Sequence, residues 1–139
     1  MPQPALVPPV ELMVRRARRK LDRLAPLQVP AELARGAALV DIRSEVQRAR
    51  DGELADAVPV PRNVLEWRCD QHSPWRDERL CGRRLILICD EGFQSSLAAA
   101  ALQELGRAGA TDVIDGFRGW VATGLPVVPA GLGAALPAI

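Results

Sequence analysis

The chain has 139 residues, of which 48% are apolar, and its formal net charge is +1 at neutral pH. This size and composition suit one globular domain with a single core. The small net charge gives no reason to expect a nucleic-acid partner, and no apolar run approaches the length needed to span a bilayer. We therefore expect neither a nucleic-acid partner nor a membrane partner.

The N-terminus and the cysteine count indicate the cellular compartment. Residues 1–9 are proline-rich and include no basic segment followed by an apolar stretch, so we expect no secretory signal. The chain has three cysteines, and an odd number in a chain without a signal argues against a disulfide scaffold. A cytoplasmic location is the resulting expectation.

The predicted elements begin after a flexible N-terminal arm, residues 1–9. A basic amphipathic helix is predicted for residues 10–24 because apolar residues recur at helical spacing, namely Val14, Ala17, Leu21 and Leu24. Pro26 ends this helix. The basic residues between positions 15 and 20 could contact nucleic acid or an acidic partner, but a solvated helix face is the favoured interpretation.

Short apolar runs then alternate with helical segments. Strands are predicted at residues 38–42, 57–60, 84–89 and 111–114, and helices at 30–35, 45–50, 63–68, 95–105 and 117–122. This alternation predicts an α/β fold, a parallel β-sheet flanked by helices on both faces. We expect a single domain over residues 10–127 that includes the basic helix, followed by a C-terminal tail at 128–139.

Cys89 is the residue best placed for chemistry. It ends the most apolar predicted strand, and an open parallel sheet binds its ligands at the carboxyl ends of its strands. The helix that follows begins with unpaired amides, which favour a negative charge such as a thiolate. Gly92 lets the intervening loop curl, so that several N–H groups converge on the sulfur. The alternative, a small buried hydrophobic residue at a strand end, stays open.

Several motifs together resemble the rhodanese family. They span residues 31–127 and are, in order, Leu39-Val40-Asp41-Ile42-Arg43, Cys89-x-x-Gly92-x-x-Ser95, Asp115-Gly116-Phe117-Arg118-Gly119-Trp120 and Gly124-Leu125-Pro126-Val127. The resemblance implies a parallel sheet flanked by helices, with a loop that starts at a cysteine which becomes persulfidated. By this resemblance Cys89 is the nucleophile. The loop residues that line its cradle are Asp90, Glu91, Gly92, Phe93, Gln94 and Ser95.

Two departures from the family pattern affect the expected substrate. The family loop commonly reads Cys-x-x-Gly-x-Arg-Ser, whereas Gln94 stands at the arginine position and adds no charge. Asp90 and Glu91 would repel an anionic donor such as thiosulfate. The second departure is at residues 52–57, where the family usually has Gly-His-Ile-Pro-Gly-Ala. The first departure argues against thiosulfate transfer and leaves relay of sulfur from a protein or small thiol open.

A nearby cation could compensate for the acidic loop. Arg43, Arg62 and Arg68 follow the carboxyl ends of predicted strands, so we expect them near the same rim of the sheet. Our hypothesis pairs Arg62 or Arg68 with Asp90 or Glu91. The alternative is that all three are ordinary surface arginines.

The sequence thus predicts a sulfurtransferase or persulfide carrier that moves sulfane sulfur through Cys89 in a two-step, ping-pong reaction. It would act on a small sulfur donor or thiol acceptor, or with a protein partner in a sulfur relay, and would need no metal or organic cofactor. The alternative is a weakly active or inactive rhodanese-like binding or redox-sensing module.

Two other sites are disfavoured by spacing. A zinc site of Cys69, His72 and Cys81 together with Cys89 lacks the short paired ligand intervals of structural zinc. A cysteine phosphatase needs Cys-x5-Arg to hold phosphate oxygens, and Ser95 is the sixth residue after Cys89.

Overall fold

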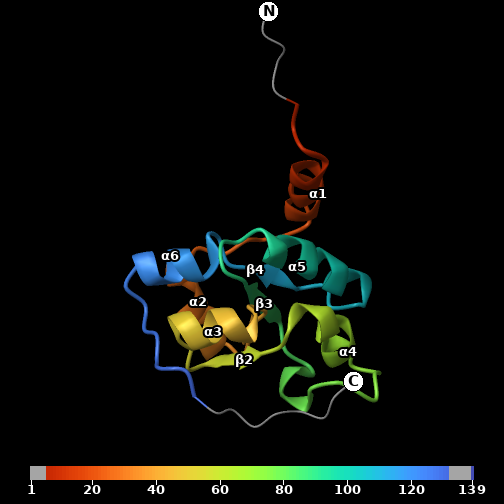
Figure 1. Cartoon of the computed structure of the whole chain (residues 1–139). Coiled ribbons are helices and arrows are strands. Elements are labelled where there is room, and N and C mark those ends of the chain that lie inside the picture. Colours follow the sequence, from red (N-terminus) through yellow and green to blue (C-terminus); the bar gives the residue numbers. More distant parts are fainter. Residues whose placement is uncertain (1–5, 132–138) are drawn as a thin grey trace, which may run out of the picture.

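A computed structural model describes residues 6–131 and 139 (Figure 1). Its strands are β1 (Ala38–Asp41), β2 (Ala57–Pro59), β3 (Leu85–Ile88) and β4 (Thr111–Asp112). Its helices are α1 (Pro9–Arg18), α2 (Val29–Ala34), α3 (Glu45–Asp51), α4 (Leu65–Cys69), α5 (Gln94–Glu104) and α6 (Gly116–Ala122). Short 3-10 turns lie at Pro26–Gln28, Arg62–Val64 and Glu78–Leu80.

The four strands form one parallel sheet in the order β2-β1-β3-β4. Val40 of β1 lies opposite Leu87 of β3, which in turn lies opposite Asp112 of β4. Because every strand runs the same way, the carboxyl ends of β1, β3 and β4 meet at one edge of the sheet. The predicted α/β fold with a parallel sheet is confirmed.

Alternate strand side chains build a core on each face of the sheet. Val40, Leu87 and Cys89 belong to the core that α4 and α5 cover. Leu39 and Ile86 belong to the opposite core, which α2 and α6 cover (Figure 1). The prediction of helices on both faces is therefore confirmed, and Cys89 lies where β3 meets the α5 layer.

The helix predicted for residues 10–24 is shorter than expected, because α1 ends at Arg18. The helix packs against α5 (Figure 1), and Val14 and Ala17 are buried. Leu24 instead extends the edge of the sheet: its N–H donates to Asp112 O at 3.0 Å, and its carbonyl accepts from Ile114 N at 2.8 Å. These two sheet hydrogen bonds replace the helical ones that the sequence pattern predicts.

The segments predicted as the arm and the tail are only partly described. Pro9 already belongs to α1, and residues 1–5 lie outside the described residues. In the tail, Val128 exchanges two backbone hydrogen bonds of 2.8 Å with Glu53, while residues 132–138 lie outside the described ones. Within the described part of the chain, no helix is long and apolar enough to cross a membrane.

Candidate active site

Cys89 directly follows β3, and its side chain is buried, with 6% of the residue exposed. Two backbone amides point at its sulfur: Gly92 N lies 3.1 Å and Ser95 N 3.3 Å from Sγ. The thiol donates to Ser95 Oγ at 3.3 Å. Such an arrangement of N–H donors stabilises negative charge on the sulfur.

Backbone hydrogen bonds from the start of α6 hold the curled loop that follows Cys89. Phe117 N donates to the Cys89 carbonyl at 2.8 Å, and Arg118 N donates to the Asp90 carbonyl at 3.0 Å. Gly92 adopts φ +88°, and an added Cβ there would lie 2.8 Å from the backbone nitrogen of Asp115. The position therefore requires glycine both for its backbone conformation and for the close approach of the α6 segment.

We expect Gly92→Ala to lower the free energy of unfolding by about 2 kcal/mol. The cost of placing alanine in a left-handed conformation and the cost of the clash with the Asp115 backbone both contribute to this loss. The added Cβ would also displace the Gly92 amide from Cys89, so alkylation of the Cys89 thiol should slow by about tenfold. Chemical denaturation and the rate of Cys89 alkylation by iodoacetamide measure the two effects. The matched control is Gly106→Ala, since Gly106 has φ +85° but nothing within 4 Å of an added Cβ. If both variants lost the same stability, the close approach of the Asp115 backbone to Gly92 would not contribute to the effect.

A buried carboxylate, Asp112 at the end of β4, organises the start of α5. Its Oδ2 accepts from Ser95 Oγ at 2.7 Å and from Ser96 Oγ at 2.8 Å. Its Oδ1 accepts from Arg23 Nε at 2.8 Å, and no part of Asp112 is exposed. Sequence reasoning missed this network. Two features of the sequence could have indicated it. One is an acid in the short strand that ends at the same sheet edge as Cys89, and the other is the pair of serines at the start of the helix that follows Cys89.

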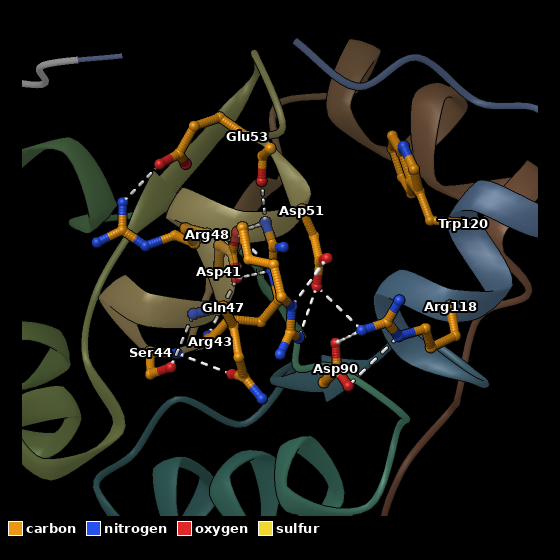
Figure 2. Close-up of polar contacts among 12 residues, drawn as sticks. Asp41, Arg43, Ser44, Gln47, Arg48, Asp51, Glu53, Asp90, Arg118 and Trp120 are labelled. Atoms are coloured by element: carbon orange, nitrogen blue, oxygen red, sulfur yellow. Dashed lines mark hydrogen bonds and ion pairs between the residues drawn. The ribbon is translucent and has the colours of Figure 1, made fainter. Parts of the chain in front are cut away.

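The acids of the loop have different environments. Asp90 is paired with Arg118, whose Nη2 lies 3.3 Å from Asp90 Oδ1 and 2.9 Å from Asp51 Oδ2 (Figure 2). Glu91 is exposed, as are Phe93 and Gln94 beside it. Hence Glu91 is the more exposed of the two loop acids.

The predicted cations are placed differently from our hypothesis. Arg62 pairs with Glu66 at 2.8 Å, so Arg118 and not Arg62 is the cation beside Asp90. Arg68 is buried and donates to the carbonyl of Trp75 at 2.9 Å. Arg62 thus bonds one helical turn along its own segment, and Arg68 bonds to the segment that follows α4.

Arg43 is also not a rim cation. Its side chain is fully buried and donates to Asp41 Oδ2 at 2.8 Å (Figure 2). It also donates to the Gly52 carbonyl at 2.9 Å. Its guanidinium carbon lies 3.8 Å from the centroid of the Phe117 ring. Arg43 thus ties the end of β1 to the turn after α3 and to α6.

The other two cysteines are free, and their surroundings differ from that of Cys89. Burial raises the pKa of the Cys69 thiol to about 12, so Cys69 is a neutral thiol at physiological pH. Cys81 is partly exposed. In residues 6–131 and 139 no group of three or more His, Cys, Asp or Glu side chains could hold a metal ion.

The family model of the rhodanese-like domain matches residues 25–123. The chain belongs to the rhodanese-like domain family. The match starts at residue 25 and α1 ends at Arg18, so the family model does not cover this helix. A search of curated proteins found no match.

Solved structures similar to this rhodanese-like domain carry different descriptions. A Rhodopseudomonas palustris protein of unknown function, described as a possible tyrosine phosphatase, is 26% identical with a TM-score of 0.78 over 91% of this chain and 98% of its own. A human single-domain sulfurtransferase is 25% identical with a TM-score of 0.59 over 72% of this chain and 95% of its own. A Pseudomonas aeruginosa thiosulfate sulfurtransferase is 23% identical with a TM-score of 0.64 over 78% of this chain and 19% of its own, which shows the fold alone.

Proposed function

We propose that this rhodanese-like domain is a sulfurtransferase or persulfide carrier that works through Cys89. The observation that carries the proposal is the pair of backbone amides, Gly92 N and Ser95 N, aimed at Cys89 Sγ. Similarity to a human single-domain sulfurtransferase supports it. A reducing cytoplasm, where we propose that the protein works, would keep the three free thiols reduced.

The reaction has two balanced steps. The Cys89 thiolate attacks the outer sulfur of the donor, a Cys89–S bond forms, and the donor's S–S bond breaks with its electron pair leaving on the departing group. An acceptor thiolate then attacks the same outer sulfur, and the electron pair of the Cys89–S bond returns to Cys89. This covalent sequence predicts ping-pong kinetics.

We propose that the donor is a thiol persulfide, small or protein-bound, in preference to thiosulfate. Gln94 brings no charge to the position where the family commonly has arginine, and exposed Glu91 repels a dianion. Arg118 neutralises Asp90 and so limits the repulsion to one carboxylate.

A phosphatase is the second candidate, because one similar structure is described as a possible tyrosine phosphatase. Its chemistry needs a bidentate cation for the phosphate oxygens. Ser95 occupies the sixth position after Cys89, and its hydroxyl is already bonded to Asp112 at 2.7 Å. We therefore favour sulfur over phosphate. An inactive binding module is the remaining alternative.

Mass spectrometry of the protein after incubation with a small persulfide or with thiosulfate tests the proposal. We expect a gain of one sulfur atom on the peptide that contains Cys89, faster with the persulfide, and its loss when a thiol acceptor is added. Absence of sulfur on Cys89 with both donors would refute the sulfurtransferase and leave the binding module. Release of phosphate from phosphotyrosine would favour the second candidate.

A further inference from the structure

We propose that Arg18 and Arg23 are positioning residues for the sulfur-binding loop, an inference that rests on the proposed function. Both precede residue 25, where the family match begins, and both donate to the carbonyl of Gly92. By bonding this carbonyl, they fix the Gly92–Phe93 peptide, which lies between the two amides, Gly92 N and Ser95 N, that point at Cys89 Sγ.

The contacts of the two guanidinium groups converge on the carbonyl oxygen of Gly92, which also accepts from Ser96 Oγ at 3.4 Å. Arg18 Nη2 lies 2.9 Å and Arg23 Nη2 lies 3.1 Å from the Gly92 carbonyl oxygen. Arg18 Nε also donates to Ser96 Oγ at 3.1 Å, and its guanidinium lies over the Phe93 ring, 5.6 Å from the centroid. Arg23 is anchored in turn by the buried carboxylate of Asp112.

Peptide geometry links these contacts to the cradle. In a trans peptide the C=O of Gly92 and the N–H of Phe93 point in opposite directions, and all described peptide bonds are trans. Glycine gives this peptide the freedom to flip, and a flip would exchange the directions of its C=O and N–H within the loop that surrounds Cys89 Sγ. Two charge-assisted hydrogen bonds to the oxygen oppose that flip.

Arg18 also supplies positive charge near the loop. Arg23 is paired with Asp112, whereas Arg18 makes no ion pair with a carboxylate among residues 6–131. Partial burial, and secondly the like charge of Arg23, lower the pKa of Arg18, yet a guanidinium stays protonated at neutral pH. α1 therefore brings a cation to a loop whose own sequence has Gln94 in place of arginine.

The test compares Arg18→Gln with Arg15→Gln, a matched control on the same helix whose side chain pairs with Glu11 at the surface. We expect Arg18→Gln to slow single-turnover persulfidation of Cys89 by about fivefold, and Arg15→Gln to leave it within about twofold of the wild-type rate. Arg18→Lys keeps the charge and one donor, so it should recover most of the rate. Arg18→Gln and Arg15→Gln behaving alike would overturn the proposal.

Two further readouts separate this inference from the proposed function. The alkylation rate of Cys89 with iodoacetamide and the NMR shifts of the Gly92 and Phe93 amides report loop geometry without sulfur transfer. We expect Arg18→Gln, and not Arg15→Gln, to change both, with recovery in Arg18→Lys. If the wild-type protein takes up no sulfur but these readouts still depend on Arg18, the proposed function fails while the positioning role stands. Unchanged readouts in Arg18→Gln would remove the positioning role itself.

Discussion

Replacing Cys89 with serine should abolish sulfur uptake, a loss of about 10³-fold or more. A serine hydroxyl is not ionised at neutral pH and cannot form a stable link to sulfane sulfur. The hydroxyl can still accept from the amides of Gly92 and Ser95, which now lie 3.1 and 3.3 Å from Sγ, so the fold should be retained. Single-turnover persulfidation and thermal unfolding measure the two outcomes.

The matched control is Cys81→Ser, since Cys81 is partly exposed and lies outside the loop. We expect this variant to take up sulfur at the wild-type rate. Cys69 needs no separate variant at neutral pH, because burial raises the pKa of its thiol to about 12. If Cys89→Ser kept its sulfur-transfer activity while Cys81→Ser lost it, the chemistry would belong to Cys81.

The sheet could be predicted from the sequence because its signals are local. The aliphatic run of β3 and the glycines at the turns place the strands to within a few residues. The segment after α1 shows the limit of this reasoning. Its apolar spacing is helical through Leu24, yet Leu24 hydrogen-bonds to Asp112 and Ile114, far away in the chain. A periodicity contains no information about a partner so distant in sequence.

The same limit separates the site residues that the sequence predicts from those that it does not. Cys89 and Gly92 could be predicted because strand end, loop and helix start are consecutive in the chain. Arg23, by contrast, reaches Asp112 across 89 residues and the Gly92 carbonyl across 69. Arg43 was predicted at the rim because it follows a strand, but strand order fixes only the edge and not the direction of a side chain. Its partner Asp41, two residues earlier, turns it inward.

Replacing Arg43 with methionine should lower the free energy of unfolding by about 3–5 kcal/mol. Asp41 would be left as an uncompensated charge, since both side chains of the pair are fully buried. The carbonyl of Gly52 would also lose its donor, and the Phe117 ring its stacked guanidinium. Urea denaturation at neutral pH measures the change in stability.

Arg15→Met is the control, because Arg15 and Glu11 form an exposed pair that should contribute less than about 1 kcal/mol. The double variant Asp41→Leu with Arg43→Met separates charge burial from packing. Removing both charges eliminates the unpaired carboxylate, so most of the lost stability should return. If the double variant were as unstable as Arg43→Met, the loss would come from the contacts of Arg43 with Gly52 and Phe117 and from the Arg43 backbone N–H, which now donates to Asp41 Oδ1 at 3.1 Å. Arg43 would then stabilise the fold mainly by packing β1 against α6, whose Phe117 N donates to the Cys89 carbonyl.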